Sequence, residues 1–198
     1  SVAILLSIAT SVICIPIWKR IAAKVGKHKA LVYSILWFSG WAFCMPLLYF
    51  IPEQALFFFL TLQILKGMAS GALVFLATSM AADVIDIDTI RSGQERSGLY
   101  FSAWGIIQKG AAAISLFIAL TVIELFGFDP TADPSQRETI NGNSNIAILG
   151  LAIMYSVVPS LFKISTLPFI WKYPLTEERQ AKIRGYIDRK VKRMASKS

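Results

Sequence analysis

The chain has 198 residues, of which 55% are hydrophobic, 12% aromatic and only 16% charged. Soluble domains carry charge on about 25% of their residues, so this composition excludes an ordinary soluble domain and predicts a mostly α-helical integral membrane protein. The net charge of +8 comes largely from two basic segments, residues 18–29 and 172–197. Cations that flank apolar runs are typical of cytoplasmic loops of membrane helices and do not indicate nucleic-acid binding.

Five apolar segments follow one another along the chain. Each complete segment is long enough to cross a hydrocarbon core about 30 Å thick at about 1.5 Å per residue. We expect the first to end near Pro16, and we expect Pro159 and Pro168 to kink the last. The chain begins inside an apolar run with no signal-peptide cleavage site, which predicts a fragment of a longer protein. The segments are expected at residues 1–17, 30–51, 55–80, 98–126 and 146–171.

The distribution of lysine and arginine predicts the orientation of these spans. The turn after the first span, the loop expected at residues 83–96 and the C-terminal tail are basic, whereas the alternate connections hold no cation or Arg137 alone. The basic connections and the C-terminus are therefore expected in the cytoplasm. Residues 174–198 place apolar side chains at helical spacing among cations, which predicts a cytoplasmic basic amphipathic tail on an anionic membrane surface. A plain solvated tail fits the same pattern.

Two lysines lie deep inside apolar spans. Lys66 is about 11 residues from the outer end of its span and Lys109 about 11 from the inner end of the next, so each is roughly 16 Å deep. A lysine at the bilayer centre costs roughly 3 kcal/mol even on the mildest insertion scale. Both are therefore candidates for a solute or ion site in a water-filled cavity. The alternative is that either lysine snorkels or pairs with an acid elsewhere in the bundle.

Trp104 and Gln108 are four residues apart, so they share a helix face beside Lys109. An aromatic ring, an amide and a cation are suited to binding a sugar ring or another polar organic solute. The alternative is that Trp104 simply packs against lipid or other helices. Small residues next to both lysines make these helices thin, which allows close packing or a cavity wall.

Charged side chains gather where the third span is expected to end. Asp83 and Asp86 share a helix face there, and Arg91 and Arg96 follow. Paired carboxylates can serve acid–base catalysis, but no nucleophile, base or metal-ligand set accompanies these two. We interpret the four residues as ion pairs that close the cytoplasmic mouth of the bundle, and we expect neither an enzyme nor a metal site.

Residues 82–113, ADVIDIDTIRSGQERSGLYFSAWGIIQKGAAA, resemble a known family. The likeness is to helix eleven and its preceding loop in the glycoside–pentoside–hexuronide:cation symporters, melibiose-permease-like members of the major facilitator superfamily. Residues 17–29 and 173–183 resemble that family's loop between helices eight and nine and its tail after helix twelve. Lys109 matches the lysine at the binding site of sugar-transporting relatives, while Ser92 replaces the usual threonine. The family pattern is met at Ala82, Asp83, Asp86, Gly93, Gly98 and Phe101.

The resemblance implies an all-α, polytopic transmembrane helix bundle, with this chain as the C-terminal half, about helices eight to twelve, of a major facilitator superfamily fold. It implies cation-coupled symport of a sugar, glycoside or similar polar organic solute by alternating access across a bacterial-type inner (plasma) membrane. Lys109 would bind the solute with Trp104 and Gln108, and Lys66 would add charge across the cavity. The coupling cation, Na⁺ or H⁺, is expected at the missing N-terminal six-helix half, and no cofactor is expected.

Two alternatives stay open. The same fold could carry a lipid-like or amphipathic anion. The chain could instead be a proton-translocating subunit of a membrane enzyme complex, in which intramembrane lysines relay protons. The second alternative would need more ionisable residues along the spans than Lys66 and Lys109.

Overall fold

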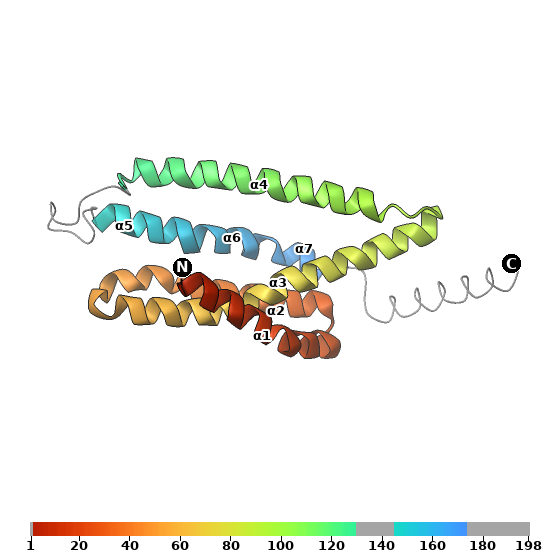
Figure 1. Cartoon of the computed structure of the whole chain (residues 1–198), viewed down its shortest axis with the longest axis horizontal. Coiled ribbons are helices and arrows are strands. Elements are labelled where there is room, and N and C mark those ends of the chain that lie inside the picture. Colours follow the sequence, from red (N-terminus) through yellow and green to blue (C-terminus); the bar gives the residue numbers. More distant parts are fainter. Residues whose placement is uncertain (1, 130–144, 174–198) are drawn as a thin grey trace, which may run out of the picture.

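A computed structural model describes residues 2–129 and 145–173, and the regular structure in these ranges is helical (Figure 1). Five stretches in it are long and apolar enough to cross a membrane. The predicted amphipathic tail at 174–198 lies outside the described residues. The elements are α1 (Val2–Val25), α2 (Lys27–Phe43), η1 (Met45–Phe50), η2 (Pro52–Gln54), α3 (Ala55–Ser92), α4 (Ser97–Leu125), α5 (Asn145–Ala152), the π-helical turn η5 (Ile153–Val157), α6 (Val158–Ser165) and α7 (Leu167–Trp171).

The first helix continues through Pro16 to Val25, well past the end expected from sequence. Proline removes one backbone hydrogen bond but does not end a helix when packing holds the following turns. Here Trp18 and Ala22 are buried against the neighbouring helices, and the Trp18 indole N–H donates to the Met68 carbonyl at 2.7 Å. The chain turns at Gly26, whose φ of 91° suits glycine, and α2 begins at the next residue.

Helix α3 is longer than expected, because the charged segment that was expected to form a loop stays helical to Ser92. Its 38 residues correspond to about 57 Å, so its last turns extend beyond a hydrocarbon core about 30 Å thick. In Figure 1 this end of α3 projects away from α1 and α2 towards the start of α4. The helix ends at Gly93, which has a φ of 69° and donates its N–H to the Thr89 carbonyl at 3.0 Å.

The fifth span is interrupted near both of its prolines. The π-helical turn η5 precedes Pro159, and a break at Thr166 precedes Pro168. Pro159 has no N–H to donate to the Tyr155 carbonyl four residues earlier, so the α-helical hydrogen-bond ladder cannot close there. The wider π-turn accommodates this loss, and the Val158 N–H donates to the Ile153 carbonyl instead.

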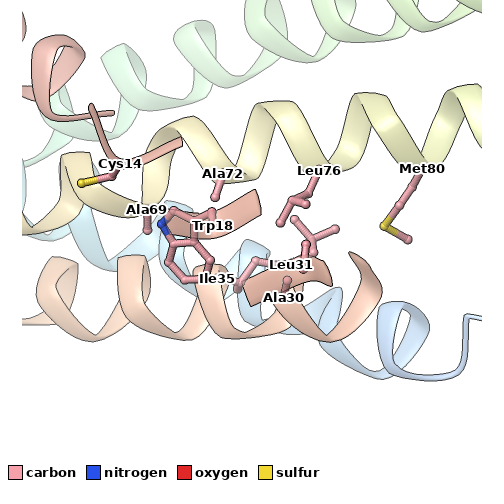
Figure 2. Packing of buried hydrophobic residues seen from close by; sticks show 10 residues of the cluster. Cys14, Trp18, Ala30, Leu31, Ile35, Ala69, Ala72, Leu76 and Met80 are labelled. Atoms are coloured by element: carbon pink, nitrogen blue, oxygen red, sulfur yellow. The ribbon is translucent and has the colours of Figure 1, made fainter. Parts of the chain in front are cut away.

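The core lies where α1, α2 and α3 meet, and α2 also packs against η5, α6 and α7. Figure 2 shows Trp18 of α1, Leu31 of α2 and Leu76 of α3 among the side chains that fill this junction. Helices α1 and α3 approach closely because α3 has glycines facing α1. A Cβ at Gly67 would lie 2.8 Å from the Ser7 carbonyl oxygen, and one at Gly71 would lie 2.6 Å from that of Ser11.

Helix α4 lies apart from this core. It contains no buried residue, and its main contacts are with α5 and η5. In Figure 1 it runs alongside α5, α6 and α7, on the far side of them from α1. Its apolar surface is therefore uncovered within the described part of the chain.

Candidate functional site

Lys66 lies in the interior of the bundle and is only 6% exposed. Two aromatic rings surround its ammonium group. The Nζ atom is 5.3 Å from the ring centroid of Phe38 on α2 and 4.7 Å from that of Tyr155 on η5. Both distances fall within the range of about 6 Å over which a cation is attracted to an aromatic face. Helix α3 therefore presents this lysine to the junction between α2 and the fifth span.

A second lysine, Lys163 of α6, shares the same ring. Its Nζ atom is 3.4 Å from the Phe38 centroid, and the side chain is partly buried. Sequence reasoning missed this residue, although the signal was there: Lys163 lies inside the fifth apolar segment, about nine residues before its basic end.

The two ammonium groups leave a positive charge that the protein only partly offsets. Among residues 2–129 and 145–173, neither group has a hydrogen-bond or ion-pair partner. Burying two lysines in a bilayer costs roughly 6 kcal/mol. A desolvated cation–π contact returns about 2 kcal/mol, and Phe38 is shared between both cations. Because both ammonium groups contact the same Phe38 ring, the two like charges also repel each other. The pair is thus suited to attract an anion.

A cavity of about 630 Å³ is linked to this pair through Tyr155, although neither lysine lines it. It lies among the start of α1, η1, the first turns of α3 and α5, and continues to Tyr155 of η5. Its lining is apolar except for Tyr49, Gln63 and Tyr155. Gln63 donates from Nε2 to the Tyr155 hydroxyl at 3.2 Å and lies one helical turn before Lys66. Tyr155 therefore forms part of the cavity wall while its ring contacts the Lys66 ammonium.

The opposite end of the bundle carries an ion pair. Lys27, at the start of α2, donates from Nζ to Asp83 Oδ2 of α3 at 2.6 Å, and the Asp83 side chain is only 4% exposed. Tyr173 lies close by and donates its hydroxyl to the Met80 carbonyl at 3.3 Å. Burial, and to a smaller extent the Asp83 carboxylate, raise the pKa of Tyr173, so its hydroxyl stays protonated as a donor.

The other predicted charged residues lie along the projecting end of α3 and just beyond it. Asp86, Arg91 and Arg96 are exposed. Arg96 donates to Gln94 Oε1 from Nε at 3.0 Å and from Nη2 at 2.6 Å. The structure therefore brings Asp83 to a lysine of the basic turn and leaves Asp86 and the two arginines at the surface.

The predicted solute-binding residues of α4 are also exposed. Trp104, Gln108 and Lys109 lie on the helix that has no buried residue. Among the described residues, no hydrogen bond, ion pair or ring contact joins Lys109 to Lys66. The cation that accompanies Lys66 in this structure is Lys163.

Two curated symporters are similar to this chain. An uncharacterized symporter of Synechocystis is 23% identical over 178 residues, which cover 88% of this chain and 31% of that protein. The sodium-dependent lysophosphatidylcholine symporter 1-A of Danio rerio is 25% identical over 180 residues, covering 89% of this chain and 31% of that protein. The chain thus spans about a third of the length of these relatives. No solved structure is a significant match.

The family model described as MFS/sugar transport protein matches residues 1–177, nearly the whole chain. This match confirms the resemblance to the cation symporters of the major facilitator superfamily that residues 82–113 indicated. A transporter family also excludes the alternative of a subunit in a membrane enzyme complex. With its five apolar helices and its buried lysines, the chain is an integral membrane protein that belongs to the MFS/sugar transport protein family of symporters, and it is not an enzyme.

Proposed function

We propose that this chain is the C-terminal half, about helices eight to twelve, of a twelve-helix transporter that couples the movement of an organic solute to a cation gradient. The observation that carries the proposal is the pair Lys66 and Lys163, two cations in the interior of an apolar bundle. Such charges mark solute or ion pathways in membrane proteins, and secondary transporters bind their solutes near the bilayer midplane. Both similar proteins are named as symporters.

The proposed orientation places the end with Lys27 and Asp83 in the cytoplasm, because the positive-inside rule assigns the basic segment 18–29 to that side. The Lys27–Asp83 ion pair then holds the cytoplasmic end of α2 against α3. Asp86, Arg91 and Arg96 are candidates for further ion pairs with the N-terminal half. A bacterial-type inner (plasma) membrane is the proposed location.

The uncovered surface of α4 supports a partner half. A helix with no buried residue gains little from the rest of this chain, so we assign its exposed side to packing against the N-terminal six helices. Lys109, Trp104 and Gln108 would then face the cavity between the halves and contact the solute. The rocking of one half against the other would expose that cavity to each side in turn. The coupling cation, Na⁺ or H⁺, would bind to acids of the N-terminal half.

A sugar, glycoside or similar polar organic solute is the first candidate cargo, because Trp104, Gln108 and Lys109 combine an aromatic face with hydrogen-bonding groups. A lipid-like or amphipathic anion is the second candidate. The apolar cavity beside Lys66 favours it, and one similar protein is named for lysophosphatidylcholine.

Uptake by the full-length protein in vesicles tests the proposed function. Sugars, glycosides and lysolipids would be compared under imposed Na⁺ and H⁺ gradients. We expect one gradient to drive accumulation of one class, and Lys109→Ala to abolish it while the protein remains inserted. The proposal fails if neither gradient drives any of these solutes, and the role of Lys109 fails if Lys109→Ala transports at the wild-type rate.

A further inference from the structure

We infer that Lys66 and Lys163 together bind the ionised head group of an organic anion, and that the apolar cavity beside them holds the hydrocarbon body of the same molecule. This inference rests on the transport function proposed above and, of its two candidate cargoes, selects the amphipathic anion. The juxtaposition of a cation pair and an apolar cavity on either side of Tyr155 carries it.

The head-group site follows from the unmet hydrogen-bonding capacity of the two lysines. Each ammonium has three N–H donors, and among the described residues none of these donors finds an acceptor. Aromatic faces attract the charge but accept hydrogen bonds poorly, so Phe38 and Tyr155 leave this capacity open. An ionised carboxylate, sulfate or phosphate supplies both the acceptors and the compensating charge.

The body of the anion is indicated by the chemistry of the cavity. A neutral sugar carries hydroxyls all around its ring, and each one needs a partner when it leaves water. Only Tyr49, Gln63 and Tyr155 offer polar side chains in this cavity, and Gln63 and Tyr155 already bond to each other. A volume of about 630 Å³ with an otherwise hydrocarbon lining suits an alkyl or aryl group instead.

The two parts of the site are joined by the π-helical turn η5. The Tyr155 hydroxyl accepts from Gln63 on the cavity side, and its ring receives the Lys66 ammonium at 4.7 Å. Pro159 lacks the N–H that would donate to the Tyr155 carbonyl, which favours the π-helical turn that holds Tyr155. A molecule that reaches from the cavity past Tyr155 would meet the cation pair.

Equilibrium binding of radiolabelled octanoate to the full-length protein in lipid nanodiscs tests the site, with empty nanodiscs as the baseline. Unlabelled 1-octanol serves as the neutral twin and acetate as the anion without an apolar body. We expect octanoate to bind and both competitors to displace it at least about tenfold less well, because each lacks one half of the recognition. Displacement by octanol as effective as by octanoate overturns the inference.

Variants of the two lysines make the test specific. Lys66→Gln and Lys163→Gln should each weaken octanoate binding about tenfold, while Lys163→Arg, which keeps the charge, should retain it within about threefold. Lys24→Gln, at an exposed position of α1, serves as the control and should bind normally. Leu48→Trp fills the cavity and should weaken binding, whereas the exposed neighbour Leu47→Trp should not. Wild-type affinity in the Lys66→Gln/Lys163→Gln double variant overturns the site.

The outcomes for this site and for the symport proposal can be separated. Lysine-dependent octanoate binding without any gradient-driven uptake would support the site and overturn the transport proposal. Gradient-driven uptake of a neutral glycoside that proceeds at the wild-type rate in the double variant would support transport and overturn the site.

Discussion

Lys27 and Asp83 form an ion pair with 2.6 Å between Nζ and Oδ2, although the two residues are 56 positions apart in sequence. The pair ties the turn between α1 and α2 to α3, close to the point where Tyr173 donates to the Met80 carbonyl. The end of α1, the start of α2 and the body of α3 therefore meet at one charged junction. The fifth span contributes Tyr173, which follows its last residue, Trp171. This junction holds together the end of the bundle that we assign to the cytoplasm.

Lys27→Ala should destabilise the full-length protein by about 2 kcal/mol. The substitution removes a charged hydrogen-bond donor from a carboxylate that is almost fully buried, and such losses are larger than those at the surface. The estimate is below the range for a fully buried pair because 23% of the Lys27 side chain is exposed. Thermal unfolding in detergent micelles measures the change. Lys24→Ala, an exposed lysine one turn earlier, is the control and should change stability by less than about 0.5 kcal/mol; equal effects would contradict the prediction.

Because α1 and α3 approach closely, we expect substitution of the α3 glycines at their contact to lower the stability of the protein. Gly67→Ala and Gly71→Ala each place a methyl group within 3 Å of a carbonyl oxygen on α1, and backbone atoms cannot move aside as a side-chain tip can. We expect each to lower stability by about 1–3 kcal/mol through overpacking. Gly40→Ala on α2 is a matched control, because nothing lies within 4 Å of its added methyl group. The same unfolding measurement applies, and a loss of stability in the control alone would refute the assigned packing.

The sequence was sufficient to predict the number and type of membrane elements, because five apolar runs can only span as helices. It was less informative about where they end. Pro16 and the charged run after Met80 were expected to stop helices, yet α1 and α3 continue past them. The extension of α1 is supported by the contact of Trp18 with Met68, which no local pattern contains. The last turns of α3 instead project beyond the packed part of the helix and end at Gly93.

The end of α3 offers a local test. Gly93 adopts a φ of 69°, a conformation that costs an L side chain about 1 kcal/mol, so Gly93→Ala should fray the last turn of the helix. Hydrogen exchange of the amides from Thr89 to Ser92 should become severalfold faster. Gly98→Ala, in the first turn of α4 and in open space, should leave that exchange unchanged. Unaltered protection in Gly93→Ala would mean that packing rather than the glycine ends α3.

The candidate site was predictable only in part. The depth of Lys66 in an apolar span was visible from spacing, and the lysine is buried at that position. Lys109 was expected at the same depth across a cavity, and that expectation stays a prediction. The structure brings a different lysine, Lys163, to Lys66 through Phe38, a relationship that depends on how the fifth span is broken and packed against α2. The depth of a residue in the membrane can be counted along its span, whereas the helices that face one another are determined by tertiary packing.

The π-helical turn before Pro159 yields a prediction that links the backbone to the site. Pro159→Ala restores an N–H that can donate to the Tyr155 carbonyl, so the span can close as a continuous α-helix. A π-turn holds one more residue than an α-helical turn does. When it converts to a regular α-helix, the residues before it, including Tyr155, rotate by about 100° relative to Lys163, the rotation of one α-helical residue. After this rotation, the Tyr155–Lys66 contact and the Lys163–Phe38 contact could no longer form at the same time. We expect octanoate binding to weaken about tenfold in a protein that remains folded, since an alanine favours the helix.

Pro168→Ala, at the second break and beyond Lys163, is the control and should bind octanoate normally. Tight binding in Pro159→Ala, or equal losses in both variants, would show that the geometry of η5 does not position the site.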